Sequence, residues 1–398
     1  MSLDLRPHQE KAIAQLSNGK ILHGGTGSGK SRTILGYYEK NESGRDIYII
    51  TTAKKRNSLD WEEEALLIGV STNPELTRYG TLTVDSWNNV KKYVDVKDAF
   101  FIFDEHKAIG SGVWAKSFVK IAKRNRWVVL SATPGDVWMD YIPVFVANGY
   151  YKNPTEFKEK HVIFAPYTKF PLVKGYRGEH RLIGLRNEVL VEMPFARHTT
   201  RYVNWVDVEY DKAVIQNTIK TRWNPYTDEP CRDISELWRV LRRITNTHPS
   251  RLEWVEKLIS THKRLIVFYN FNYELEILRE LAHIPGVEYA EYNGMVKQPV
   301  PDSDSWVYIV QYVAGAEAWN CTSTNAICFH SLTYSYKNLE QAKGRIDRMD
   351  TDFEELYYYI LRSDSLTDLK VKDSLGRKED FNEAKTLRNM AEKGWAGY

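Results

Sequence analysis

The chain has 398 residues, of which 42% are hydrophobic and 27% are charged, with a formal net charge of +3 at pH 7. This length corresponds to about two or three domains, and the globular composition excludes a generally disordered chain. The small net charge excludes a uniformly basic protein, so any affinity for nucleic acid has to come from a local basic surface.

Short apolar runs rich in β-branched and aromatic residues recur in chain order, separated by charged helical stretches. They are residues 20–24, 46–52, 99–105 and 126–133 in the first half, and 264–270, 305–313, 325–331 and 355–361 in the second. Continuous apolar runs that alternate with helices predict strands buried on both faces of a parallel sheet.

Because the pattern occurs twice, we expect an α/β fold with two tandem parallel-sheet domains, residues 1–195 and 196–365. Residues 366–398 are expected to form a charged helical tail. We expect this tail to be exposed, and to pack back onto the second domain rather than to dock a partner.

The three cysteines include no C-x-x-C pair, which argues against a disulfide framework and a zinc ribbon. The N-terminus, "MSLDLRPHQEK", is too polar for a signal peptide, and no apolar run approaches the roughly 20 residues that cross a bilayer. We therefore expect a reduced, cytoplasmic protein without a membrane partner.

The stretch "GGTGSGKS" after the first predicted strand matches the phosphate-binding pattern G-x-x-x-x-G-K-S and opens a predicted helix. Backbone N–H groups of such a loop close around phosphate oxygens, and the helix presents its positive end. The alternative, a glycine-rich turn with a chance lysine, does not account for the strand before the loop and the helix after it. The expected nucleotide-binding residues are Gly24, Gly25, Thr26, Gly27, Ser28, Gly29, Lys30, Ser31 and Arg32.

Within this loop, Lys30 is expected to reach the β- and γ-phosphates of ATP, and the Ser31 hydroxyl to join the shell of a Mg²⁺ ion. The strand over residues 99–105 ends in Asp104 and Glu105. Behind a phosphate loop, Asp104 is expected to hold Mg²⁺ and Glu105 to activate the attacking water. A simple strand-end cap is the alternative for this acidic pair.

With these groups in place, the sequence resembles the superfamily 2 helicases and translocases, and further motifs follow in the family's order. "LRPHQ" resembles the adenine-reading element, with Arg6 and Gln9. "SATP" resembles motif III, "AGAEAWN" resembles motif V with Gly315, and "QAKGRIDR" matches motif VI. The resemblance implies two RecA-like domains with the ATP site in the cleft between them, and ATP and Mg²⁺ as cofactors.

The motif VI match gives Gln341, Arg345 and Arg348 a role, although mixed charge on a solvated helix face is the alternative. In this family the second domain lends arginines to ATP held by the first. Such a finger increases the rate by about 10³–10⁵ in related systems. We expect Arg345 and Arg348 to lie one helical turn apart, with Gln341 one turn earlier and Arg348 as the finger proper.

Several stretches resemble the chromatin-remodelling-type DNA translocases and the small phage DNA helicases similar to them, among them "VLRRITNTHPSRLEWVEKLI". Two positions depart from the family pattern. Lys107 occupies the motif II position that usually contacts motif III, and Glu317 and Ala318 replace the residues more common in motif V.

A nucleic-acid track is expected at the carboxyl ends of the parallel strands, where such sheets bind ligands. "TTAKKRN" and "LTVDSW" resemble motifs Ia and Ib, and Trp319 within motif V is interpreted as core in preference to a base-stacking residue. Each contact has the alternative of a solvated loop residue. The expected contacts are Thr52, Lys54, Lys55, Arg56, Thr83, Tyr269, Asn270 and Thr333.

Together these motifs predict an ATP-dependent DNA helicase or translocase in phage DNA replication or recombination, located in the host cytoplasm. DNA is the expected partner, with replication or recombination proteins as further candidates. The alternatives are an RNA helicase, a nucleic-acid-binding ATP switch, and the motor subunit of a restriction complex. A strand-separating wedge would have to come from about residues 160–235.

Overall fold

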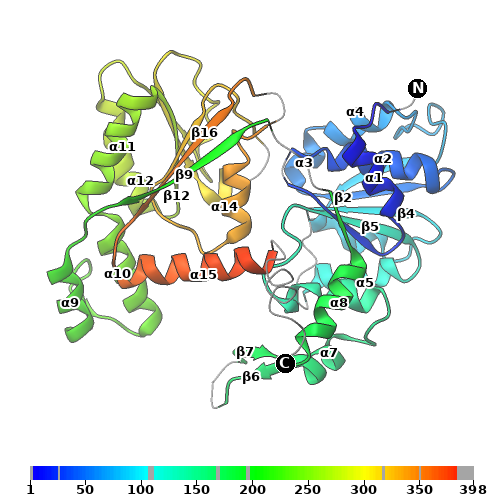
Figure 1. Cartoon of the computed structure of the whole chain (residues 1–398), viewed down its shortest axis with the longest axis horizontal. Helices are drawn as coiled ribbons and strands as arrows, with labels where there is room; N and C mark the ends of the chain where they lie inside the picture. The colour runs from blue at the N-terminus through cyan, green and yellow to red at the C-terminus, as the bar shows by residue number, and fades with distance from the viewer. Residues whose placement is uncertain are drawn as a thin grey trace. The chain divides into compact units, whose positions relative to one another are not determined.

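The computed structural model describes residues 3–25, 27–105, 112–166, 171–193, 198–315, 319–348 and 351–382, with side chains to residue 378. The chain divides into two compact units, Met1–Ala196 and Arg197–Tyr398 (Figure 1). Each unit is described on its own below. Over the described part of the chain, no helix combines the length and apolar character needed to cross a membrane.

The first unit contains, over its described residues, a six-stranded parallel sheet in the order β3-β2-β4-β5-β1-β8. Its strands are β1 (Lys20–His23), β2 (Ile47–Thr51), β3 (Leu82–Ser86), β4 (Phe100–Asp104), β5 (Arg126–Ser131) and β8 (Leu190–Glu192). Its α-helices are α1 (Pro7–Gln15), α2 (Lys30–Asn41), α3 (Ala53–Asn57), α4 (Asp60–Leu66), α5 (Val113–Ala122), α6 (Ile142–Ala147), α7 (Pro154–His161) and α8 (Glu179–Val189). A small antiparallel hairpin, β6 (Val162–Phe164) and β7 (Val173–Tyr176), extends from this unit in Figure 1.

The central strand β4 illustrates why an unbroken apolar run forms this kind of strand. Phe100 and Ile102 belong to the core on one face, together with residues of α1 and α2. Phe103 points to the other face, where its ring centroid lies 4.8 Å from that of Phe118 on α5. Since successive side chains of a strand alternate between faces, only a continuous apolar sequence fills both cores.

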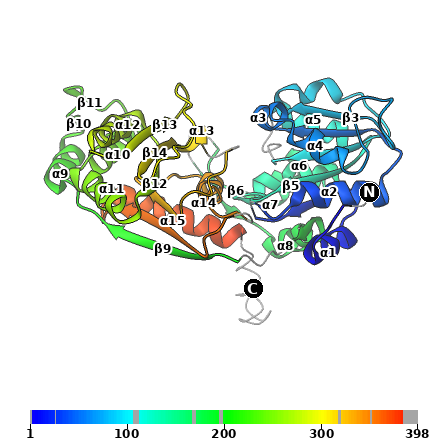
Figure 2. The ribbon, with the colours of Figure 1, turned by 90° about the horizontal axis from the view of Figure 1, so that it is seen from above.

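The second unit repeats this plan with a six-stranded parallel sheet over its described residues, in the order β13-β14-β12-β15-β16-β9. Its strands are β9 (Thr200–Asp207), β12 (Arg264–Tyr269), β13 (Glu288–Tyr292), β14 (Trp306–Gln311), β15 (Ala326–Phe329) and β16 (Glu355–Arg362). Its α-helices are α9 (Lys212–Thr221), α10 (Ile234–Asn246), α11 (Pro249–His262), α12 (Asn272–Leu278), α13 (Tyr312–Gly315), α14 (Tyr336–Lys343) and α15 (Leu366–Asn382). A two-stranded hairpin, β10 (Trp223–Asn224) and β11 (Glu229–Pro230), connects α9 and α10, and β9 forms one margin of the unit in Figure 2.

The eight runs predicted as strands are all strands in the structure, so the expected α/β fold with two parallel sheets is confirmed. Four sheet strands were not predicted: β3, β8, β9 and β13. Most residues of β9 are exposed, and polar residues interrupt the apolar sequence of β13. Edge strands of this kind lack the double-sided burial that makes a central strand recognisable.

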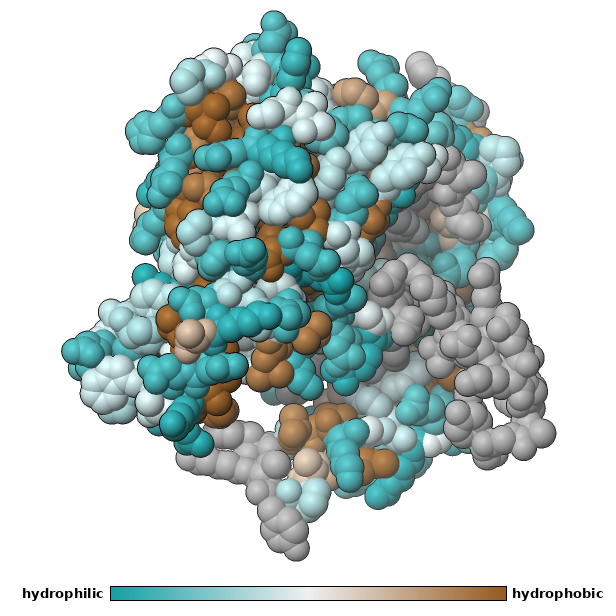
Figure 3. All heavy atoms as spheres, turned by 60° about the vertical axis from the view of Figure 1, so that its left-hand side comes forward, coloured by the Kyte–Doolittle hydropathy of each residue, from teal (hydrophilic) through white to brown (hydrophobic). Residues whose placement is uncertain are grey.

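Local signals in the sequence fix the helices that lead into the second sheet. The side chain of Asp233 accepts a hydrogen bond from the Glu236 backbone over 2.7 Å and so caps α10. Pro249 occupies the first turn of α11, where its missing N–H is not needed. In the space-filling view, hydrophobic side chains form separate groups among hydrophilic ones rather than one continuous area (Figure 3).

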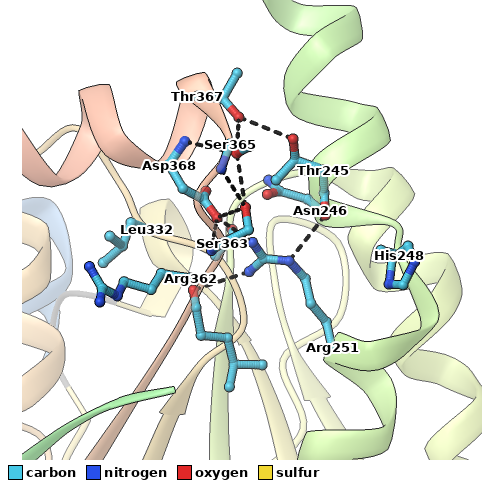
Figure 4. Close-up of polar contacts among 12 residues, drawn as sticks. Thr245, Asn246, His248, Arg251, Leu332, Arg362, Ser363, Ser365, Thr367 and Asp368 are labelled. Atoms are coloured by element: carbon cyan, nitrogen blue, oxygen red, sulfur yellow. Dashed lines mark hydrogen bonds and ion pairs between the residues drawn. The ribbon is translucent and has the colours of Figure 1, made fainter. Parts of the chain in front are cut away.

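A buried ion pair attaches α15 to this unit (Figure 4). The Arg251 side chain has no exposed surface, and its Nη2 atom lies 2.6 Å from Asp368 Oδ2. Its other nitrogens donate to backbone carbonyls of Thr245, His330 and Leu361. Asp368 also accepts hydrogen bonds from the backbone and hydroxyl of Ser363, so the buried carboxylate is well satisfied.

The first part of α15 packs onto the second unit, as expected for the tail, but the expectation that the tail is exposed is wrong there. Val371 and Leu375 are buried in the core on one face of the sheet. The charged composition of the segment concealed this, because two apolar positions one helical turn apart are enough to anchor a helix.

Candidate functional site

The loop between β1 and α2 has the backbone that the phosphate-binding pattern requires. Gly29 precedes the first residue of α2 with φ 80° and ψ 30°, in the left-handed region that favours glycine. A Cβ atom at this position would lie 2.4 Å from Gln9 Nε2, so a side chain here would also force the Gln9 amide to move. Thr26, one of the predicted nucleotide contacts, lies outside the described residues.

Lys30 and Ser28 have the side chains that a bound phosphate would engage. The Lys30 ammonium donates to the carbonyl oxygens of Gly24 and Gly25 at 2.6 and 3.0 Å. The Ser28 hydroxyl is buried and has no hydrogen-bond partner among the described residues. A buried hydroxyl without a partner is costly, and a phosphate oxygen would satisfy it, so this loop fits a phosphate group.

The Gln9 side chain ties α1 to the phosphate loop. Its carbonyl oxygen accepts from the Arg6 backbone over 2.8 Å, and its amide nitrogen donates to the Gly29 carbonyl over 3.2 Å. Next to it, a ring nitrogen of His8 lies 3.2 Å from the Ser28 carbonyl. Arg6 and Gln9 are thus placed beside the loop, and their reading of adenine stays a prediction.

Asp104 ends β4, and only β5 lies between β4 and β1 in the sheet. The Asp104 carboxylate and the phosphate loop after β1 are therefore both at the carboxyl ends of the strands, the edge considered below, and lie about 10 Å from each other. Asp104 is buried, and its Oδ2 atom accepts hydrogen bonds from three side chains. The donors are the Thr51 hydroxyl at 2.8 Å, the Lys55 ammonium at 2.7 Å and the Trp61 indole at 3.3 Å. Burial opposes the charge on Lys55, but the adjacent Asp104 carboxylate outweighs it and raises the pKa of the lysine.

Glu105 follows in a left-handed backbone conformation with φ 56°. This conformation is uncommon for a residue with a side chain, and such strain collects at functional sites. The next residues, His106 to Ser111, lie outside the described part of the chain, and Lys107 is among them.

The residues predicted to hold Mg²⁺ are Ser31 at the start of α2 and Asp104 at the end of β4. Among the described residues, no group of three or more acidic, histidine or cysteine side chains is placed to hold a metal ion. A hydroxyl, one carboxylate, waters and phosphate oxygens form the oxygen-rich set that Mg²⁺ prefers, so the residues fit Mg²⁺ bound together with a nucleotide. Arg32 pairs with Glu64 at 3.4 Å and is partly exposed.

The basic helix α3 follows β2 at the same edge of the sheet. Thr52 caps it by accepting a hydrogen bond from the Lys55 backbone over 3.3 Å, and Lys54 is exposed. Arg56 contacts Asp85 at 3.2 Å. Burial alone would raise the pKa of Asp85, but hydrogen bonds from Asn89, Tyr93 and the backbone, together with Arg56, hold it below its usual value.

Thr83 does not lie at this edge. It is the second residue of β3 and pairs with Tyr48 near the start of β2, whereas Ser86 pairs with Thr51 at the carboxyl ends. Thr83 and Ser86 are three residue steps apart along the strand, which puts Thr83 about 10 Å from the edge. The expectation that Thr83 lies at a strand end is therefore wrong, because Thr83 is the second residue of β3. A contact between Thr83 and nucleic acid stays a prediction.

In the second unit, Arg345 and Arg348 are not on a helix, contrary to the prediction. The helix α14 ends at Lys343, and Gly344, which has a low helix propensity, follows it. Arg345 is buried and donates to the carbonyl oxygens of Gln341 and Trp319 at 3.0 and 2.6 Å. The expected action of Arg345 and Arg348 on ATP stays a prediction.

The motif V residues have clear packing roles. Gly315 ends α13, and a Cβ atom there would lie 2.0 Å from Val310 Cγ1, so no side chain fits without movement. The Trp319 indole donates to the Gly315 carbonyl over 2.8 Å and packs against the core on this face. This agrees with the interpretation of Trp319 as a core residue.

Tyr269, Asn270 and Thr333 lie together at the carboxyl ends of β12 and β15. The Asn270 amide donates to the Ser331 hydroxyl over 2.8 Å and to the Leu332 carbonyl over 3.2 Å. Tyr269 has no exposed surface and Thr333 is buried, so neither side chain is presented to a strand of nucleic acid. Contact of these three residues with nucleic acid stays a prediction.

An arginine–aromatic cluster occupies this edge and was missed in the sequence. The Arg242 guanidinium lies 4.9 Å from the Phe271 ring and 5.2 Å from the Tyr334 ring. Arg243 lies 3.9 Å from the Tyr226 ring and 5.5 Å from the Tyr273 ring. The signal that could have found it is the Arg-Arg pair of α10, together with an aromatic residue directly after Asn270 and another directly after Thr333.

Comparisons with protein families, curated proteins and solved structures found matches among the solved structures alone. No protein-family model matches it, and no curated protein matches it. Among solved structures it is similar to the SWI2/SNF2 ATPase core of Sulfolobus solfataricus in complex with dsDNA. The two are 15% identical, the match covers 96% of this chain and 92% of that chain, and the TM-score is 0.42. At this identity and score, function has to be inferred from the site residues themselves.

Proposed function

We propose that this protein is a nucleic-acid-dependent ATP hydrolase that couples hydrolysis to movement along DNA. The observation that carries the proposal is the arrangement at one edge of the first sheet. The glycine-rich loop that opens α2 holds Lys30 and the Ser28 hydroxyl, which has no hydrogen-bond partner among the described residues. The buried Asp104 ends β4 at the same edge.

The chain's own residues divide the work at this site. Lys30 leaves the loop carbonyls and neutralises phosphate charge, while Ser28 and the backbone N–H groups of the loop hold phosphate oxygens. Mg²⁺ held by Ser31 and Asp104 would offset negative charge on the β- and γ-phosphates. Glu105 orients the attacking water and accepts its proton. We further propose that Arg348, and with it Arg345, stabilises charge on the transferred phosphoryl group.

A path for nucleic acid is supported at the carboxyl edge of each sheet. In the first unit, α3 presents the exposed Lys54 beside Lys55 and Arg56. In the second unit, the arginine–aromatic cluster presents Tyr334 and Tyr226, which are 36% and 41% exposed. Basic groups that follow phosphates and rings on which bases stack are the two elements of single-strand binding.

On this basis we propose a DNA helicase or translocase that serves DNA replication or recombination, and the resemblance to small phage helicases favours a phage origin. An RNA track is the second candidate, because phosphate contacts do not distinguish the two nucleic acids. An ATP switch without turnover is less well supported, since Lys30, Asp104 and Glu105 together provide what hydrolysis requires.

The test is steady-state ATP hydrolysis without nucleic acid and with single-stranded DNA, duplex DNA or RNA. Wild type is compared with Lys30→Ala and Arg348→Ala, and Lys40→Ala at the exposed far end of α2 is the matched control. We expect strong stimulation by DNA, its loss in the first two variants and its retention in the control. Nucleotide binding without stimulation by any nucleic acid would replace the motor by an ATP switch.

A further inference from the structure

We propose that Lys55 is the resident cation of the Asp104 carboxylate, that a divalent metal ion displaces it, and that the displaced ammonium then binds a nucleic-acid phosphate. This inference rests on the proposed function and deepens it, because it joins the metal site to the nucleic-acid track through one side chain. Its starting observation is the 2.7 Å contact between Lys55 Nζ and Asp104 Oδ2.

The Oδ2 atom of Asp104 has no room for both the Lys55 ammonium and a metal ion. A carboxylate oxygen offers about two lone-pair positions, and here Thr51, Lys55 and Trp61 already donate to Oδ2. Thr51 and Trp61 belong to the buried framework, in which Trp61 has almost no exposed surface. A metal ion at Oδ2 would therefore take the place of the ammonium. A metal ion at Oδ1, the other oxygen of the same carboxylate, would lie within a few ångströms of the ammonium and repel it as a like charge.

Lys55 can leave, whereas Asp104 cannot. The Lys55 side chain is 28% exposed and starts from a helix of five residues, while that of Asp104 is 4% exposed at the end of a central strand. The Trp61 ring, 5.0 Å from the Lys55 ammonium, is a further contact of the paired cation. The exit leads to the surface of α3, beside the exposed Lys54.

The other charged groups that act on Lys55 favour its retention. Glu105 and Glu64 both interact favourably with its charge. Glu64 is partly neutralised by Arg32, and burial raises the pKa of the Glu64 carboxyl. The Asp104 carboxylate is thus the principal anion that holds the ammonium, and a cation bound there releases it.

Because coupling between two ligands is reciprocal, a nucleic acid that withdraws Lys55 must strengthen metal binding at Asp104 by the same factor. The structure thereby offers a physical route by which the track stimulates the ATP site. It acts within the first unit and needs no rearrangement of the sheet.

Terbium luminescence measures this competition without turnover, in the presence of a non-hydrolysable ATP analogue that supplies the remaining oxygen ligands of the metal. Tb³⁺ is a hard cation that prefers oxygen ligands, as Mg²⁺ does, and the Trp61 indole, 3.3 Å from Asp104 Oδ2, can sensitise its emission. Binding at this site is defined as the part of the luminescence that is lost in Asp104→Asn. Mg²⁺ is then titrated as the competitor. If the wild type shows no Asp104-dependent signal, the inference is overturned, because no metal then displaces the lysine.

We expect Lys55→Met to lower the half-saturating Tb³⁺ concentration by about fivefold or more, the lower end of ordinary coupling between sites. Lys55→Arg, which keeps a cation, should behave like the wild type. Lys40→Met is the matched control, since it removes a positive charge from the exposed far end of α2, which carries none of the predicted contacts with metal or nucleic acid. An unchanged or weakened metal affinity in Lys55→Met would assign Lys55 a structural role.

A second arm separates this inference from the proposed function. Addition of an oligonucleotide should tighten Tb³⁺ binding in the wild type and in Lys40→Met, and leave Lys55→Met unaffected. If the metal titrations give the expected results but DNA does not stimulate ATP hydrolysis, the proposed motor function is overturned and the displacement of Lys55 by the metal ion is kept. If DNA stimulates ATP hydrolysis but neither Lys55→Met nor DNA changes the metal affinity, the motor function is kept and the displacement of Lys55 is overturned.

Discussion

The Gln9 side-chain amide lies 3.2 Å from the Gly29 carbonyl oxygen and so joins the first helix of the chain to the loop that opens α2. Gly29 has a left-handed backbone, and a Cβ atom there would lie 2.4 Å from the same amide. The two residues therefore form one unit, in which the loop conformation and the position of α1 depend on each other.

Gly29→Ala should weaken nucleotide binding and lower the free energy of unfolding. The left-handed conformation alone costs about 1–2 kcal/mol for a residue with a Cβ atom, and the contact with Gln9 adds to it. Gln9→Ala removes the obstructing amide, so the double variant should recover the steric part of the loss. Chemical denaturation and binding of a fluorescent ATP analogue measure both quantities, and strictly additive losses would contradict the coupling.

Removal of the buried Arg251 should destabilise the second unit strongly. Its ion pair with Asp368 at 2.6 Å is enclosed, and Arg251→Met leaves a buried carboxylate without its counter-charge, which costs about 3–5 kcal/mol. Arg377, which pairs with Asp373 on the exposed face of the same helix α15, is the matched control. Arg377→Met should change the free energy of unfolding by about 0–1 kcal/mol in urea denaturation. Equal effects of the two substitutions would contradict the anchoring role of Arg251.

Acid should destabilise the second unit through His330. Burial and the neighbouring Arg251 lower the pKa of this histidine to about 3, and its ring nitrogen lies 3.1 Å from the Asn246 carbonyl, to which it donates. In the unfolded chain the histidine takes up a proton near pH 6.5, so the unfolded state binds more protons below that pH. Stability from neutral His330 is therefore complete above about pH 6.5 and falls by about 1.4 kcal/mol per pH unit below it.

This slope can be isolated by measuring the free energy of unfolding from pH 7.5 to pH 5 in wild type and His330→Gln. The glutamine amide keeps a donor for the Asn246 carbonyl but does not titrate. The wild type should lose about 2 kcal/mol more than the variant between pH 6.5 and pH 5. Parallel curves for the two proteins would show that His330 does not control the acid sensitivity.

The sequence predicted the central strands because their apolar runs have to fill cores on both faces, as Phe100 and Phe103 do on β4. It missed β9 because an edge strand with exposed residues carries no such run. The phosphate loop was predictable because its glycines and lysine are local in sequence. Contacts between distant segments were not: the pairing of Lys55 with Asp104 spans 49 residues.

The errors have the same origin. Arg345 and Arg348 were placed on a helix because a spacing of three residues is helical, but Gly344 follows the last residue of α14. Thr83 was placed at a strand end because its motif was read without the strand register that pairs it with Tyr48. In both cases residue spacing was used where only tertiary pairing decides the position.

The arginine–aromatic cluster should contribute base stacking to single-strand binding. Tyr226 and Tyr334 each lie against an arginine and keep an exposed ring, and base stacking on such rings is worth about 1–3 kcal/mol per base. Tyr226→Ala and Tyr334→Ala should each weaken binding of a single-stranded oligonucleotide by that amount, measured by fluorescence anisotropy at fixed salt. Tyr202 is the control, since it is 41% exposed, as Tyr226 is, but stacks on Tyr357 on β16.

Salt dependence separates stacking from charge in the same experiment. Loss of a ring leaves the number of phosphate contacts unchanged, so the slope of log affinity against log salt should be preserved in both variants. Arg56→Ala, by contrast, should reduce that slope because it removes a candidate phosphate contact. If both tyrosine variants bind like the wild type while Tyr202→Ala binds weakly, the single strand passes over the β9 margin, and the cluster only packs α10 against the sheet.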